Sequence, residues 1–269
     1  MHVLLEAREI SVDFGHISAL RQANLKIRTG ETLALVGDNG AGKTTLVRVL
    51  GGELAPTGGQ IFHEGQPIRS QGVRDAQDLG IHIVYQDLAL CPDLTAAENL
   101  SLGHEPVRGG LAGRMGFLDR RAATVETERR LGLLQIRLPD IESPIRSLSG
   151  GQRQSLAVAR GLTYGNACIL MDEPTASLGT EQTSMVYKAI RQAALSGVAV
   201  VVVSHDLTQV LEFADRVAIM RHGRVVAVRV ASGLTVRSMI DIMMGAVDPQ
   251  AENEFDEGIG TGDTNQEQR

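Results

Sequence analysis

The chain has 269 residues, of which 43% are hydrophobic and 3% aromatic, and a formal net charge of −6. This length is enough for one large domain, or for one domain that carries an insert. Residues 248–269 hold seven acidic side chains and one basic, so they account for the whole net charge. The body is balanced at 25 charges of each sign, which argues against a large nucleic-acid footprint.

The cysteines and the apolar runs bear on location. Two cysteines, Cys91 and Cys168, form no disulfide framework, and the first residues do not read as a secretory signal. We therefore expect a reducing, cytosolic setting. The longest apolar stretch, residues 198–203, is far too short to span a bilayer. Any membrane role is expected to come through a partner.

The order of the predicted elements indicates an α/β fold. In chain order, β-structure is predicted at 3–27, 32–36, 58–68, 80–85, 167–171, 198–203, 217–220 and 224–230. Helices are predicted at 46–50, 118–134, 153–161, 181–195, 207–213 and 235–244. Alternating strands and helices favour a mostly parallel sheet covered on both faces. The predicted parts are a core at about 1–87 and 165–232, an inserted helical subdomain at about 88–164, a C-terminal helix at about 235–246, and an acidic, disordered tail at 248–269.

The strongest local signal is the sequence GDNGAGKTT at residues 37–45. It fits the P-loop pattern G-x-x-x-x-G-K-[ST] and lies between a predicted strand and a predicted helix, as that motif requires. Such a loop curls its N–H groups toward phosphate oxygens, and the helix presents its N-terminus to the same anion. Lys43 is expected to reach the β- and γ-phosphates, and the Thr44 hydroxyl to ligate Mg²⁺. The expected nucleotide-binding residues of this loop are Gly37, Asp38, Asn39, Gly40, Ala41, Gly42, Lys43, Thr44 and Thr45.

Two further motifs follow. The sequence LSGGQ at 148–152 stands just before a predicted helix. A Ser-Gly-Gly turn that opens a helix is a second anion site, since it offers a hydroxyl, free N–H groups and the helix dipole. Farther along, an apolar strand ends in Asp172 and Glu173, and ligands sit at the carboxyl ends of strands in open α/β sheets. We expect Asp172 to hold Mg²⁺ through water and Glu173 to polarise the attacking water.

These three motifs, in this order, resemble the ATP-binding subunit of ABC transporters, and the resemblance covers the chain to about residue 245. It implies a P-loop NTPase (RecA-like) core with a mostly parallel sheet, an N-terminal antiparallel β portion and an inserted helical subdomain, together about 1–247. ATP and Mg²⁺ are the implied ligands. A second copy would complete each site with its signature turn, which comprises Ser149, Gly150, Gly151 and Gln152.

Three smaller markers take roles from the same resemblance. Phe14 would stack on adenine. Gln86 would join the Mg²⁺ site and the catalytic group from the loop between core and helical subdomain. His205 would contact the γ-phosphate, in a catalytic set with Lys43 and Glu173. Taken alone, a phenylalanine at a strand end is more often a core residue, a glutamine a solvated loop residue, and a histidine here part of a helix start.

One position departs from the family pattern. Gly179 stands where the family usually has an aspartate that helps signal across the dimer, so cross-talk between sites cannot be assumed. A glycine there, with GDNGAG at 37–42, VYQDLALCP at 84–92 and MMG at 243–245, resembles the single-domain ATPases of fructose- and ribose-type monosaccharide importers. The sugar itself would be chosen by other chains.

The resemblance implies ATP hydrolysis that powers sugar import at the cytoplasmic face of the membrane. The implied partners are permease subunits, a second copy and, indirectly, a sugar-binding protein, with no nucleic acid. The alternative is a non-transport ABC ATPase acting on nucleic acid or the ribosome, against which the short helical block and the balanced charge argue. A P-loop kinase or GTPase is a third class, but LSGGQ has no role there.

Overall fold

The computed structural model describes residues 2–68, 72–85, 88–134, 136–176 and 178–246. The main sheet has six strands in the order β10-β9-β3-β8-β7-β6, and only β10 runs antiparallel to its neighbour. Its strands are β3 (Thr32–Gly37), β6 (Ile81–Val84), β7 (Cys168–Asp172), β8 (Ala199–Val203), β9 (Arg216–Arg221) and β10 (Arg224–Val230).

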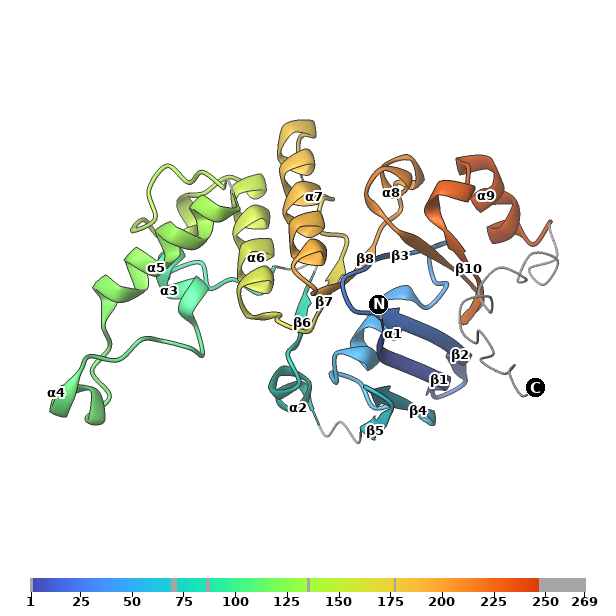
Figure 1. Cartoon of the computed structure of the whole chain (residues 1–269), viewed down its shortest axis with the longest axis horizontal. Helices are drawn as coiled ribbons and strands as arrows, with labels where there is room; N and C mark the ends of the chain where they lie inside the picture. The colour runs from blue at the N-terminus through green and yellow to red at the C-terminus, as the bar shows by residue number, and fades with distance from the viewer. Residues whose placement is uncertain (1, 69–71, 86–87, 135, 177, 247–269) are drawn as a thin grey trace, which may run out of the picture.

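The central strands of this sheet are apolar throughout because helices cover both faces. Every residue of β3, β7 and β8 is buried, as expected for parallel strands that have no solvent-facing side. One face is covered by α6 (Gly150–Tyr164), α7 (Thr180–Leu195), α8 (Leu207–Phe213) and α9 (Val236–Met244) (Figure 1). The short 3₁₀ turn η2 (Ala231–Gly233) leads into α9.

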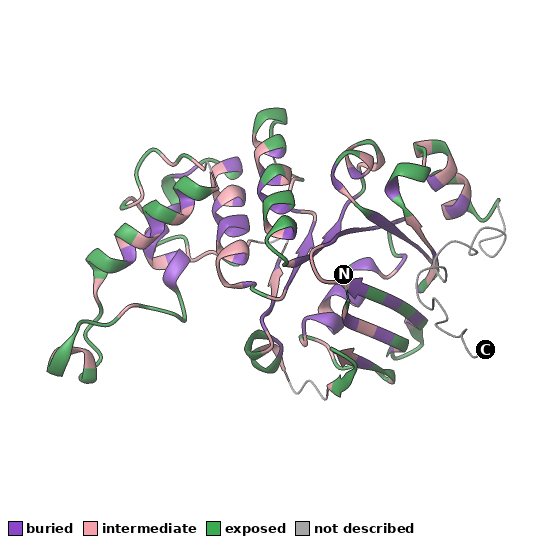
Figure 2. Cartoon of the chain, viewed as in Figure 1, coloured by how far each residue is buried: buried purple, intermediate pink, exposed green. Residues whose placement is uncertain are grey.

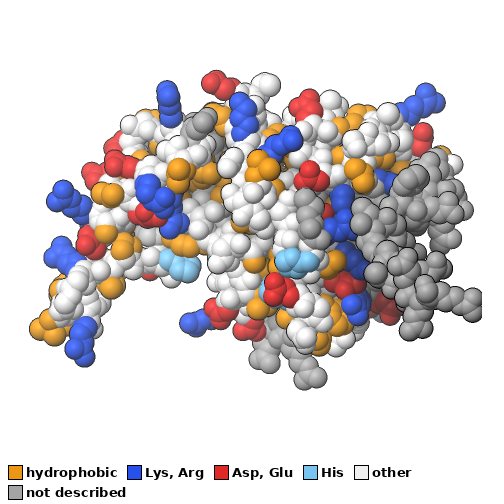
Figure 3. Space-filling model, viewed as in Figure 1, with side chains coloured by type: hydrophobic (Ala, Val, Ile, Leu, Met, Phe, Trp, Pro, Cys, Tyr) orange, Lys and Arg blue, Asp and Glu red, His pale blue; other side chains and the backbone are white. Residues whose placement is uncertain are grey.

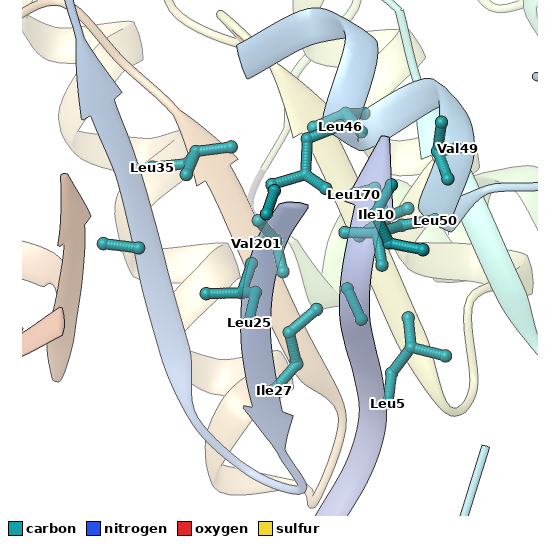
Figure 4. Close-up of a cluster of buried hydrophobic side chains, with 14 of the residues drawn as sticks. Leu5, Ile10, Leu25, Ile27, Leu35, Leu46, Val49, Leu50, Leu170 and Val201 are labelled. Atoms are coloured by element: carbon teal, nitrogen blue, oxygen red, sulfur yellow. The ribbon is translucent and has the colours of Figure 1, made fainter. Parts of the chain in front are cut away.

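A smaller antiparallel sheet covers the other side. It runs in the order β2-β1-β4-β5, with β1 (Val3–Phe14), β2 (Ile17–Arg28), β4 (Gly58–His63) and β5 (Gln66–Ile68). Helix α1 (Lys43–Leu50) lies between the two sheets, where Leu46 and Leu50 join Leu5, Leu35 and Leu170 in one apolar cluster (Figure 4). The phosphate loop is thus anchored in the best-buried part of the molecule.

The helical region extends away from both sheets (Figure 1). It contains α3 (Ala96–Ser101), α4 (Gly110–Arg114), α5 (Arg120–Leu133) and the 3₁₀ turn η1 (Ile145–Ser147). Leu100, Leu131, Ile145 and Leu156 form its own apolar cluster, which is separate from the two clusters of the main sheet. Because Leu156 belongs to α6 while Val158 of the same helix faces the main sheet, α6 joins the helical region to the core.

The predicted α/β class is confirmed, and two details of the predicted elements are wrong. The β-structure predicted at 3–27 forms two strands of 12 residues each. Helix α2 (Val73–Asp78) has no counterpart in the prediction. The block 88–164 is less continuously helical than expected, because loops and a β-bridge between Val107 and Leu118 interrupt it. None of the described helices is long and apolar enough to cross a bilayer, and the tail 248–269 lies outside the described residues.

Candidate functional site

The loop between β3 and α1 has the backbone that its glycines predict. Gly37, Gly40 and Gly42 have φ values of 153°, 79° and 101°, in a region that disfavours side chains. A Cβ on Gly42 would lie 2.7 Å from the Ala19 carbonyl oxygen, and one on Gly37 would lie 2.4 Å from that of Met220. The loop therefore fits closely against β2 and β9. The first turn of α1 adds N–H groups that have no acceptor within the helix.

Lys43 lies inside this curl. Its Nζ donates to the carbonyl oxygens of Gly37 at 2.7 Å and Asp38 at 2.9 Å, and the residue is only 9% exposed. Burial lowers the pKa of Lys43, while the charges of Glu173, Asp172 and Asp38 oppose the shift. A buried ammonium group that is held only by carbonyls favours an incoming anion.

Asp172 ends β7 beside Thr44. The aspartate is 7% exposed, and burial raises its pKa, with the nearby Glu173 charge adding to the effect; the Thr44 hydroxyl and the charge of Lys43 act in the opposite direction. Among the described residues, no three His, Cys, Asp or Glu side chains gather as a metal cluster. One buried carboxylate beside a hydroxyl suits Mg²⁺, because this ion is usually bound by one or two protein groups together with phosphate oxygens of the substrate.

Glu173 and His205 meet at adjacent strand ends. The Glu173 N–H donates to the Val203 carbonyl oxygen at 3.1 Å, which ties the end of β7 to the end of β8. Glu173 has a positive φ of 50°, a strained conformation for a residue with a side chain. Its Oε1 lies 3.3 Å from Nδ1 of His205, whose side chain is 67% exposed. The sheet thus brings together two residues that are 32 positions apart in the sequence.

The signature turn forms the start of α6. Ser149 caps the helix: its Oγ accepts from the Gln152 N–H at 3.2 Å, and its own N–H donates to the Gln152 side chain at 2.9 Å. Ser149 and Gly150 are exposed, whereas Gly151 is buried. A Cβ on Gly151 would lie 2.4 Å from Oε1 of Gln182, so α6 and α7 begin side by side.

Gly179 lies at that same junction. It precedes α7, and its N–H donates to Gln182 Oε1 at 3.3 Å. Nothing lies within 4 Å of the position that a Cβ on Gly179 would take. The space for a larger side chain at this position therefore exists within one copy of the chain.

Two other predicted residues are placed less fully. Phe14 is 47% exposed at the end of β1, two pairs along the ladder from Leu20 of β2. A Cβ on Gly42 would lie 2.9 Å from the Leu20 side chain, so the β1–β2 turn borders the phosphate loop. Gln86 lies outside the described residues.

The sequence reasoning missed Gln154. This residue of α6 is 4% exposed, and its Nε2 donates to the Glu173 carbonyl oxygen at 3.4 Å. It therefore ties the signature helix to the residue expected to polarise water. The only signal in the sequence is an amide on a face of α6 that is otherwise apolar.

Comparisons with known proteins agree with this geometry. The family model described as "ABC transporter" matches residues 20–176. The chain is 38% identical to the fructose import ATP-binding protein FrcA of Rhizobium meliloti over 93% of this chain and 96% of that protein. It is 37% identical to the xylose/arabinose import ATP-binding protein XylG of Sulfolobus acidocaldarius, over 90% and 94%.

Solved structures share the fold. A dimeric ATP-binding cassette in a post-hydrolysis state bound to ADP and Pi has a TM-score of 0.72 and 26% identity, over 86% of this chain and 100% of that one. A nucleotide-free ATP-binding cassette from an ABC transporter has a TM-score of 0.73 and 23% identity, over 91% and 96%. With a phosphate loop, an Asp-Glu strand end and a capped signature turn on this scaffold, the chain belongs to the ABC transporter family as one of its ATP-binding subunits.

Proposed function

We propose that this chain hydrolyses ATP to power the import of a sugar, namely a monosaccharide, through a partner membrane permease. Two observations support it: the site has the parts that phosphoryl transfer needs, and the relatives matched over nearly their full length are named for importing fructose, xylose or arabinose. Those names favour the transport class over the non-transport alternative. In this proposal residues 1–247 act as one ATPase domain, with the helical insert at about 88–164.

ATP binding uses the curled loop. Its N–H groups and the N-terminus of α1 hold the phosphates, Lys43 exchanges its two carbonyl partners for phosphate oxygens, and Phe14 stacks on the adenine. Thr44, Asp172 and Gln86 would hold Mg²⁺. The buried carboxylate of Asp172 would gain a positive counter-charge from it. When bound, the metal ion offsets negative charge on the β- and γ-phosphates.

Hydrolysis is in-line attack of water on the γ-phosphate. Glu173 accepts a hydrogen bond from that water and orients it, and the strained backbone at Glu173 is held by its bonds to Val203 and Gln154. His205, in contact with Glu173, turns its imidazole toward the γ-phosphate. Gln86, in the loop between the core and the helical region, transmits the state of the γ-phosphate to the helical region. The chemistry is mainly positioning and charge stabilisation.

Each ATP-binding site is completed by a second copy of the chain. Within one copy Ser149 and Gly150 are exposed, and the Ser149 side chain caps its own helix. In a head-to-tail dimer, the residues Ser149, Gly150, Gly151 and Gln152 of one copy cover the γ-phosphate bound by the other. ATP favours the closed dimer because only that state makes both sets of contacts.

The permease is proposed to contact the surface around residues 87–99, from the cytoplasmic face of the membrane. Asp93 in this surface has a side chain that is 77% exposed. The test is cross-linking from Asp93→Cys in a Cys91→Ser background, since Cys91 is partly exposed nearby. Leu195→Cys, on an exposed site of α7, is the matched control.

We expect permease capture from position 93 and not from position 195. Deletion of the gene should abolish high-affinity uptake of one or a few monosaccharides and spare other nutrients. Normal uptake of every sugar tested, with no capture at position 93, would refute the importer function. In that case ATPase activity without transport would identify a non-transport member of the family.

A further inference from the structure

The segment at residues 106–118, called the tip below, is a folded protrusion at the end of the helical region (Figure 1). It contains α4 and is closed by the Val107–Leu118 bridge, by an Arg108 N–H bond to Phe117 O at 2.9 Å, and by an Asp119 N–H bond to Pro106 O at 2.7 Å. A Cβ on Gly113 would lie 1.8 Å from the Arg108 carbonyl oxygen. The backbone of the tip therefore follows one specified path.

The tip exposes large apolar side chains that a surface normally avoids. Val107, Leu111, Met115, Phe117 and Leu118 are 54%, 74%, 67%, 54% and 49% exposed. Figures 2 and 3 show this end as mostly exposed, with hydrophobic and Lys/Arg side chains on it. Apolar side chains that cluster within a dozen residues on a surface mark a site that contacts another apolar phase.

The charge of the tip has one sign. Residues 106–118 contain two arginines, Arg108 and Arg114, and no acidic residue. Among the described residues, neither arginine belongs to an ion pair. The flanking carboxylates are engaged with backbone: Asp119 caps α5 at Ala122, and bonds from backbone N–H groups lower the pKa of Glu105. The tip thus combines exposed apolar groups with cations that lack an anionic partner.

We propose that the tip binds an anionic lipid surface, with its apolar side chains entering the headgroup region and its two arginines on lipid phosphates. Surface-bound segments combine these two features, and their affinity adds buried apolar area to attraction for anionic lipid. The tip is also convex and has only 13 residues, whereas a stable protein interface takes about 20–30 residues on each side. A lipid contact of this size would therefore supplement a larger interface elsewhere, the proposed one with the permease.

The position of the tip fits this addition. The tip begins seven residues after Asn99, the last residue of the surface proposed to contact the permease. Helix α4 of the tip belongs to the same helical region as α3, which contains Asn99. A chain docked on its permease through that surface therefore brings the helical region, with the tip at its end, close to the membrane. This lipid contact goes beyond the proposed transport function and does not depend on which sugar is carried.

The test uses the purified full chain and vesicles of phosphatidylcholine with or without phosphatidylglycerol, free of any permease. The parent should float with the anionic vesicles, and less so as salt rises. Arg108→Gln/Arg114→Gln should bind about 30-fold more weakly, at roughly tenfold per 1.4 kcal/mol and ~1 kcal/mol per arginine. Arg191→Gln/Arg224→Gln removes the same net charge elsewhere and should bind like the parent.

Insertion has its own reporter because the chain contains no Trp. In Phe117→Trp the emission should shift to shorter wavelength on anionic vesicles, while in Leu195→Trp, at a 76% exposed site, it should not. ATPase activity of all variants should stay normal, which shows that they are folded. Vesicle binding that is absent, or equal in tip and control variants, overturns the proposal. If the tip arginines are instead needed only to capture permease, the tip is a protein contact. Neither result changes the interpretation of the sugar-uptake test, which examines the proposed transport function.

Discussion

The phosphate loop and the signature turn both lie at helix starts, where free N–H groups favour an anion, but they differ in burial. Lys43 and Asp172 are 9% and 7% exposed. Lys43 begins α1, directly after the loop that follows the buried strand β3, and Asp172 ends the buried strand β7. Ser149 and Gly150 are exposed and lie on a helix that joins the main sheet to the helical region. The first site is assembled by the core of one copy, and the second presents its polar groups outward.

This difference in burial is the basis of a proposed division between nucleotide binding and the response to assembly. A buried site excludes water and holds its groups in place, so it contributes tight, preorganised binding. An exposed site gains its full effect only when another surface covers it, so it responds to assembly.

The largest effect is expected at the buried site. Glu173→Gln removes the carboxylate that orients water, so turnover should fall by about 10²–10⁴-fold, while ATP binding persists. ATP-bound dimers should accumulate and appear in size-exclusion chromatography with Mg²⁺-ATP. Glu212→Gln, an exposed change on α8, should turn over normally. Near-normal hydrolysis by Glu173→Gln would exclude its catalytic role.

The exposed site should act across the dimer. Lys43→Ala and Ser149→Arg should each abolish activity as homodimers. Mixed in equal amounts they place both lesions in one composite site and leave the other intact, so activity should return to roughly a quarter of normal. Persistent inactivity despite proven mixed dimers would mean either that the sites are obligatorily coupled or that Ser149 does not act on the partner's ATP.

The two regions should also differ in how far damage spreads. Leu131→Ala and Leu46→Ala each remove a fully packed leucine, which are 3% and 0% exposed, and should cost about 2–5 kcal/mol. Amide hydrogen exchange should quicken mainly in α3 and α5 for Leu131→Ala, and in both sheets for Leu46→Ala. Equal patterns for the two variants would show one cooperative unit.

The smallest effect is expected on the surface of the helical region. Hydrogen bonds from Arg129 and Arg130 hold the pKa of Glu126 at about 2, below its usual value of 4.5. Because a lowered pKa stabilises the folded state only while the group is ionised, this contribution is present above pH 4.5 and is lost as the pH falls toward 2. Water screens these exposed pairs, so Glu126→Gln should lower the melting temperature at neutral pH by at most about 2 °C. The difference from the parent should vanish in acid; a difference that grew in acid would contradict the assignment.

The local parts of this protein could be predicted from the sequence. The P-loop, the signature turn and the apolar strand ending at Asp172 are each set by neighbouring residues, because glycine positions, helix caps and apolar runs dictate local backbone. Their order along the chain was enough to indicate the family and the α/β fold. Helix α2 was missed because it has only six residues, over 73–78, four of them polar, which is too short a run to show a helical period.

The contacts between distant residues could not be predicted from the sequence, because they depend on how the strands and helices pack. The contact between Glu173 and His205 arises from the pairing of β7 with β8, and the bond from Gln154 to Glu173 arises from the packing of α6 on the sheet. No local pattern encodes such contacts, since they depend on how strands align and which helix faces they cover. Exposure follows the same rule. The apolar side chains of the tip face solvent because no described part of the helical region packs over them.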